Sequence, residues 1–240
     1  MKQCIEWRRD CLDEVYTKIR AAVKAIRPEL AINIHGGSSW HLDAGNLFSR
    51  ISCQRLSDLA YFENYHNEIF FAAFLRGVSQ RRTMAHLPYV SDAFHAHDPI
   101  GGYSNDEYNA VASGLVAHGA IPGMFLRWLP DGGLSKSQIS LMEPIFREIE
   151  EKEPYLAGAS PITYAAIVCS EATKTYYRRD NPDRSSLPHL EGAFVTLSRL
   201  RIPVEFLLAE MDLKLETLKK FRVVILPNTA ILLKPQVEAL

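Results

Sequence analysis

The segment LSDLAYFENYHNE, Leu56–Glu68, determines how the rest of the sequence is interpreted. Its short apolar run, Leu59–Phe62, ends abruptly in a carboxylate, an amide, a phenol and an imidazole, Glu63–His66. A continuous apolar run of this length is typical of a strand that helices cover on both faces. In barrels of alternating strands and helices, active-site side chains follow the carboxyl ends of the strands. We therefore expect a buried strand with active-site residues directly after its carboxyl end.

Three further apolar runs end in polar side chains in the same way. They are Leu30–Gly37, Thr83–Phe94 and Ala120–Trp128, and their polar groups are Asn33 with His35, Asp92 with His95, and Arg127 with Trp128. Helical patterns separate these runs, at 5–27, 67–82, 104–119 and 135–156, and Ser104 with Glu107 predicts a capping box. Alternation of this kind predicts βα units and a parallel sheet with its polar side chains at one edge.

The character of the sequence changes near residue 160. Beyond a connector, three strand-like runs at 163–171, 203–210 and 222–228 alternate with helical patterns at 187–202 and 212–221. This βαβαβ order is typical of a doubly wound, flavodoxin-like sheet. We expect an α/β fold with two domains, residues 1–158 and 159–240. No phosphate-binding glycine motif occurs in the second part, so we expect no catalysis from it.

Composition excludes several classes of partner. The 240 residues carry 27 basic and 28 acidic side chains with no basic block, so nucleic acid is not an expected partner. No apolar run is long enough to span a membrane. The four cysteines have no zinc-like spacing and suit a reducing compartment, so we expect a cytoplasmic protein without a structural metal. A signal peptide would be missed if the natural N-terminus lies upstream.

The stretch from Gly192 to Leu240 carries a resemblance to a known family. Its marks are a helix followed by RIPVEF, an acidic turn, LKKFRVVILPN, and a helix after Leu233. It resembles the β-galactosidase trimerisation-type domain of family-42-like glycoside hydrolases, a flavodoxin-like (class I glutamine amidotransferase-like) domain that follows a (β/α)8 TIM barrel. The resemblance implies that this chain is an internal fragment: the C-terminal half of the barrel and the start of that domain. It also implies a glycoside, oligosaccharide or polysaccharide substrate, no cofactor, and a homo-oligomer, possibly a trimer.

Two carboxylates are the candidate catalytic groups. Glycoside cleavage needs a pair of carboxyl groups, one acting as acid and the other as nucleophile or base. Glu63, between aromatic neighbours at a strand end, is the first candidate, because partial desolvation there would raise its pKa. Asp92 is the second, although the family pattern has a glutamate at the end of that strand. The alternative for Glu63 is a solvated loop carboxylate or a cap of the next helix.

Polar and aromatic residues near the strand ends are candidate sugar contacts, because amides, imidazoles and guanidinium groups bind hydroxyls and aromatic faces stack on pyranose rings. They are Asn33, His35, Trp40, Asn64, Tyr65, His95, His97, Arg127 and Trp128. His95 and His97 could instead bind a metal in a metal-dependent hydrolase. A non-catalytic carbohydrate-binding or assembly protein is the other alternative to a glycoside hydrolase.

Overall fold

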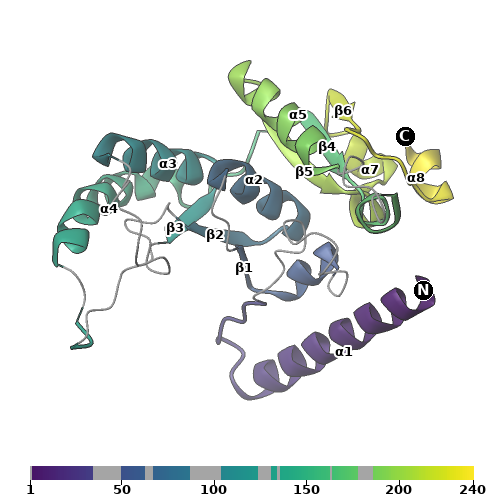
Figure 1. Ribbon diagram of the computed structural model, residues 1–240, viewed down its shortest axis with the longest axis horizontal. Helices are drawn as coiled ribbons and strands as arrows, with labels where there is room; N and C mark the ends of the chain where they lie inside the picture. Colours follow the sequence, from purple (N-terminus) through teal and green to yellow (C-terminus); the bar gives the residue numbers. More distant parts are fainter. Residues whose placement is uncertain are drawn as a thin grey trace.

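A computed structural model of the chain describes residues 2–34, 50–62, 67–86, 104–123, 131–133, 136–162, 164–177 and 186–240 (Figure 1). The first part holds α1 (Lys2–Ile26), the 3₁₀ helix η1 (Ile51–Leu56), β1 (Leu59–Phe62), α2 (Glu68–Ser79), β2 (Arg82–His86), α3 (Asn105–Ala117), β3 (Ala120–Gly123) and α4 (Lys136–Leu156). The second part holds β4 (Ala165–Cys169), the π-helix η2 (Thr173–Tyr177), α5 (Leu187–Arg199), β5 (Val204–Leu208), α6 (Ala209–Asp212), α7 (Leu215–Leu218), β6 (Val223–Ile225) and α8 (Lys234–Ala239).

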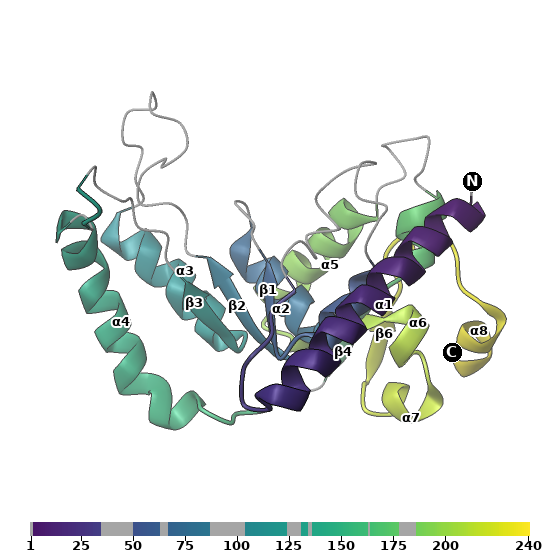
Figure 2. The same cartoon turned by 90° about the horizontal axis from the view of Figure 1, so that it is seen from below.

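The first sheet is parallel, as the alternating pattern predicts. Its strand order is β1-β2-β3, with Ala60 opposite Thr83 and Thr83 opposite Ala120. Helices α2 and α3 pack against these strands, and α4 packs on α3. In Figure 2 the three strands run side by side with α3 and α4 beside β3. The mixed α/β class and the parallel pairing are therefore confirmed.

The predicted strand Leu30–Gly37 differs from the structure over its described part. Residues 30–34 form no ladder, although Ile32 O accepts a hydrogen bond from Asp58 N at 2.8 Å and Ile34 N donates to Ser57 Oγ at 3.0 Å. The carboxylate of Asp58 takes the place of a backbone partner by accepting from Ile32 N at 3.0 Å. The Asp58 side chain thus replaces one backbone hydrogen bond of a strand pairing. The pattern of apolar residues in the sequence does not reveal this replacement.

Helix α1 ends beside this segment and is held there by charge. The Asp58 carboxylate lies 2.7 Å from both Arg20 Nη2 and Lys24 Nζ. These cations, which donate hydrogen bonds to the carboxylate, hold the pKa of Asp58 below its ordinary value. The end of α1 is therefore fastened to the residue that precedes β1.

The second sheet is also parallel, with its first strand in the centre. The order is β5-β4-β6, and Ala165 is opposite both Val204 and Val223. All five residues of β4 are buried, because neighbouring strands cover both of its edges and helices lie over the sheet. One face packs with α5 and α2, and the other face forms a smaller core with Leu213 and Leu218.

Helix α2 joins the two sheets into one core. Ten of its twelve residues are buried, which fits a helix that is apolar around its whole circumference. Its Phe70 and Phe74 lie against Phe206 of β5, with ring centroids 5.6 and 5.4 Å apart, and Phe194 of α5 completes the cluster at 5.8 Å from Phe206. The hydrophobic core thus crosses the predicted domain boundary at residue 158.

Helix α3 starts with the capping box that the sequence predicts. Ser104 Oγ accepts from Glu107 N at 3.3 Å, and Glu107 Oε2 accepts from Ser104 N at 2.7 Å. Two backbone donors that the helix itself cannot satisfy are thereby paired. The φ of Gly119, just beyond the helix end, is 75°, as expected of a glycine that terminates a helix.

We expect Ser104→Ala to lower the free energy of unfolding by about 1 kcal/mol, because the N-cap acceptor is lost. The matched control is Ser113→Ala, an exposed position in the middle of the same helix, where alanine should be neutral or slightly stabilising. Urea unfolding monitored by circular dichroism measures both. Equal midpoints for the two variants would contradict the role of the cap.

Candidate active site at the strand ends

The carboxyl ends of β1, β2 and β3 lie next to one another along one edge of the first sheet. Phe62, the last residue of β1, is opposite Ala85, and His86, the last residue of β2, is opposite Gly123, the last residue of β3. Since the strands are parallel, the segments that follow them leave the sheet at this same edge. This arrangement is the one from which β/α folds build their active sites.

Most of the predicted site residues follow these strand ends in sequence but lie outside the described residues. They are Glu63, Asn64 and Tyr65 after β1, Asp92, His95 and His97 after β2, Arg127 and Trp128 after β3, and His35 and Trp40 in the segment before η1. Their roles in catalysis and sugar binding stay predictions.

Asn33 is the one predicted site residue that the structure describes. Its side chain is exposed, and its Nδ2 donates a hydrogen bond to Leu59 O of β1 at 2.7 Å. The amide therefore has one backbone partner already and keeps its carbonyl oxygen and second N–H for another group. Its role as a substrate contact stays a prediction.

A second polar cluster, which is not among the sites predicted from the sequence, lies at the carboxyl ends of β4 and β5. The carboxylate of Glu210, just after β5, accepts hydrogen bonds from Glu171 N at 3.1 Å and Ala172 N at 3.0 Å, and lies 3.1 Å from Ser170 Oγ. Ligands of open parallel sheets commonly bind at such strand ends. Here the chain's own carboxylate fills that position, so Glu210 holds the segment after β4 in place.

Glu171 and Lys174 are ionisable side chains of opposite sign beside this cluster, and Glu171 is buried. Burial raises the pKa of the Glu171 carboxyl group, against the opposing effect of the Lys174 and Arg9 cations. Burial likewise lowers the pKa of Lys174, although the negative charge of Glu171 acts to raise it. The Glu171 side chain also accepts a hydrogen bond from Ile51 N at 2.8 Å. Glu171 thus connects the segment after β4 to η1 of the first part.

Helix α1 contributes charged groups to the same region. Arg9, whose side chain is 2% exposed, donates from Nη2 to Thr175 Oγ1 of η2 at 2.7 Å. Arg50 bonds to Asp10 at 2.6 Å and to Glu6 at 2.8 Å, and also pairs with Asp13. These contacts fasten α1 to η1 and η2, and we assign them a structural role.

A sequence signal for this second cluster exists. Ser170 and Glu171 follow the apolar run of β4 directly, and Glu210 follows β5 by two residues. This is the pattern of polar strand ends that identified the first candidate site. The partners from α1 and η1 carry no such signal.

The described residues hold no group of three or more histidine, cysteine, aspartate or glutamate side chains that could bind a metal. All four cysteines are free, and two of them, Cys53 and Cys169, are buried. Burial raises the pKa of Cys53 to about 12, so its thiol is not a reactive thiolate. Within the described helices, none has the length and apolarity needed to cross a bilayer.

Comparison with solved structures shows the fold to be shared with glycoside hydrolases. The chain superposes on a β-galactosidase from the psychrophilic Marinomonas ef1 with a TM-score of 0.67 at 11% sequence identity, covering 98% of this chain and 42% of that one. It superposes on α-L-fucosidase isoenzyme 2 from Paenibacillus thiaminolyticus with a TM-score of 0.63 at 19% identity, covering 95% of this chain and 33% of that one. The chain thus spans less than half the length of either enzyme. No protein-family model and no curated protein sequence matches it.

Proposed function

We propose that the chain is part of a glycoside hydrolase and forms one side of its sugar-binding site. The observation that carries this proposal is the shared edge of β1, β2 and β3, whose carboxyl ends are adjacent in register. Each of these strands is followed in sequence by carboxylate, imidazole, amide or guanidinium side chains. The likeness of the fold to a β-galactosidase and an α-L-fucosidase supports the same class of reaction.

Glu63 is the proposed acid, base or nucleophile, because it follows the last residue of β1 directly. Asp92 is proposed as its partner carboxylate, since hydrolysis of a glycosidic bond requires two. The remaining polar and aromatic residues after the strands would bind hydroxyl groups and stack on sugar rings. Such groups orient the substrate between the two carboxyl groups.

The proposed architecture is the C-terminal half of a (β/α)8 barrel, residues 1–158, followed by the start of a flavodoxin-like domain, residues 159–240. The parallel first sheet supports the barrel, and the order β5-β4-β6 supports the second assignment, because flavodoxin-like sheets begin with their first strand between the second and third. The resemblance to family-42-like enzymes is part of this proposal, as is a homo-oligomer. Four free cysteines support a cytoplasmic location.

We expect Glu63→Gln to lower kcat on aryl glycosides by at least about 100-fold, because an amide cannot transfer a proton or attack the anomeric carbon. The complete gene product would be assayed with 4-nitrophenyl β-galactoside and α-L-fucoside. Glu143→Gln, at an exposed position on α4, is the matched control and should keep full activity. Equal activity of the two variants would exclude Glu63 from catalysis. Asp92→Asn tests the second carboxylate in the same assay.

A further inference from the structure

Glu68 is a buried carboxylate at the start of α2, and the proposed reaction gives it no role. Only 9% of its surface is exposed. Burial of a carboxylate opposes folding unless other groups compensate for the lost hydration. Buried ionisable side chains are therefore concentrated at functional sites, where a reaction or a ligand needs them. The position of Glu68 in the fold decides whether it belongs to such a site.

Helix α2 begins at the edge of the first sheet where the strands end. It connects β1 with β2, which are parallel neighbours, so it runs antiparallel to both of them. Its last residue, Ser79, comes shortly before Arg82, the first residue of β2, at the opposite edge of the sheet. The amino end of α2, and Glu68 with it, therefore lies at the carboxyl ends of the strands, which is the edge of the candidate active site.

Two other residues of α2, at intervals of four, show on which face of the helix Glu68 lies. Arg76 donates a hydrogen bond to His118 O, just before β3 begins, at the amino edge of the sheet. Ala72 lies in the core cluster that contains Ala85 of β2. Residues four apart share a face of a helix, and each turn advances about 5.4 Å. Glu68 is thus on the face of α2 that is turned toward β2 and β3, one turn beyond Ala72 in the direction of the strand ends.

The turn that carries Glu68 is fixed by contacts with α5. Asn67, the residue before it, has a φ of 58°, in the left-handed region that asparagine tolerates better than most side chains. Its Nδ2 donates a hydrogen bond to the carboxylate of Glu191 in α5. The ring of Phe70 also packs against Phe194 of α5, with ring centroids 5.6 Å apart. Helix α5 therefore holds the start of α2 in one orientation, as a group that binds a substrate requires.

Glu68 stands at the wrong position to cap its own helix. In a capping box the glutamate is the third helical residue, as Glu107 is in α3, whereas Glu68 is the first residue of α2. The N–H groups of the first turn favour a negative charge there. An ionised carboxylate only accepts hydrogen bonds, so it binds donors such as the hydroxyl groups of a sugar.

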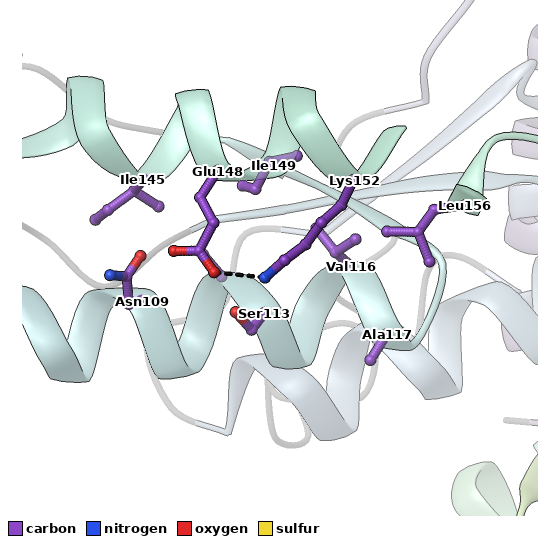
Figure 3. Close-up of a pocket in the computed structure, with 10 residues that line it drawn as sticks. Asn109, Ser113, Val116, Ala117, Ile145, Glu148, Ile149, Lys152 and Leu156 are labelled. Atoms are coloured by element: carbon purple, nitrogen blue, oxygen red, sulfur yellow. Dashed lines mark hydrogen bonds and ion pairs between the residues drawn. The ribbon is translucent and has the colours of Figure 1, made fainter. Parts of the chain in front are cut away.

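A carboxylate beside a groove elsewhere in the chain provides a contrast. The groove, of about 200 Å³, lies between α3 and α4 and is lined mainly by apolar side chains, with Glu148 among the lining residues (Figure 3). Glu148 pairs with Lys152, as the dashed line in Figure 3 shows, and these side chains are 45% and 49% exposed. The charge of Glu148 is thus matched within α4 and screened by water. Glu148 therefore supplies a matched control for Glu68.

We propose that Glu68 is a substrate-binding carboxylate of the candidate active site, where it accepts hydrogen bonds from hydroxyl groups of the sugar. The inference deepens the proposed glycosidase function and rests on it, because both place the sugar at the carboxyl ends of β1, β2 and β3. It also gives α5 of the second part a role at that site, through the contacts that orient the start of α2. Glu63 and Asp92 keep the chemical steps.

Isothermal titration calorimetry of the complete gene product tests this role. The probes are 4-nitrophenyl β-thiogalactoside and α-L-thiofucoside, whose sulfur linkage resists hydrolysis, so that binding is measured without a reaction. Glu68→Gln should raise the Kd of the thioglycoside that binds at least about tenfold, because hydrogen bonds to a charged acceptor are stronger than those to a neutral amide. Glu148→Gln should leave the Kd unchanged. With the hydrolysable glycosides, Glu68→Gln should raise KM more than it lowers kcat.

Melting curves separate a lost sugar contact from a loss of folding. Glu68→Gln should bind more weakly at an unchanged or higher melting temperature, since it removes a buried charge. If that variant is less stable, the deciding variant is Glu68→Asp, which keeps the charge but withdraws the carboxylate oxygens by one methylene group and should also bind more weakly. Unchanged Kd values for the Glu68 variants, or an unchanged protein that binds neither thioglycoside, would overturn the proposal. Binding without hydrolysis would contradict the proposed reaction but not this role of Glu68.

Discussion

We expect Gly77→Ala to destabilise the whole chain by about 3 kcal/mol, because there is no room for a methyl group where α2 crosses β5. A Cβ at Gly77 would lie 2.8 Å from both the backbone nitrogen and the Cβ of Phe206, and nearer still to its carbonyl oxygen. Two of these atoms belong to the backbone of a buried strand, so the contact cannot be relieved by turning a side chain. The helix and the sheet must move apart.

Gly192→Ala is the matched control for this prediction. Gly192 also lies within a helix, α5, but apart from its chain neighbours and the backbone of its own helix no atom lies within 4 Å of the position that its Cβ would occupy. Alanine there should stabilise the chain by about 1 kcal/mol, because it favours the helix. Urea midpoints measure both variants, and a single unfolding transition is expected because one core joins both sheets. The critical result is that the two substitutions change the free energy of unfolding in opposite directions. A stabilising effect of Gly77→Ala would contradict the close approach of α2 to β5.

The local elements were the most predictable part of the fold. The helix at 104–119, with its capping box, was predicted from Ser104 and Glu107, since all of its determinants are close in sequence. The strands β1 to β6 were predicted from short apolar runs, although the structure ends several of them earlier. The run Thr163–Glu171, for example, has a strand that ends at Cys169. The residues beyond it turn into η2, because Glu210 binds the backbone N–H groups of Glu171 and Ala172.

Contacts between distant segments were not predictable. Helix α2 is buried between the two sheets because it packs against β5, which lies more than 120 residues further along the chain. The bond from Ile51 N to Glu171 also joins residues 120 positions apart, and Arg9 reaches Thr175 over 166 positions. Apolar periodicity indicates that α2 is buried but not which surface covers it. For the candidate site, the sequence predicted the edge at which the strands end, and the described strand ends agree with it.

The second large effect is expected at Arg55, which connects η1 to the second sheet. Its Nη2 lies 2.6 Å from Asp212 Oδ2, and its Nε donates to Val78 O at 2.8 Å. The side chains of Arg55 and Asp212 are 20% and 8% exposed. We expect Arg55→Met to lower the free energy of unfolding by about 3 kcal/mol, because it leaves the Asp212 carboxylate buried without its cation.

Arg147→Met on α4 is the same substitution at an ion pair that is open to water. Arg147 Nη2 lies 2.5 Å from Glu143 Oε1, about as close as the pair of Arg55, but these side chains are 72% and 53% exposed. Solvent screens the interaction, so we expect Arg147→Met to lower the free energy of unfolding by at most about 0.5 kcal/mol. Urea unfolding of both variants, each compared with the unchanged chain, tests whether burial rather than distance sets the strength of the pair. Equal losses would mean that Asp212 finds another partner, such as water, once Arg55 is removed.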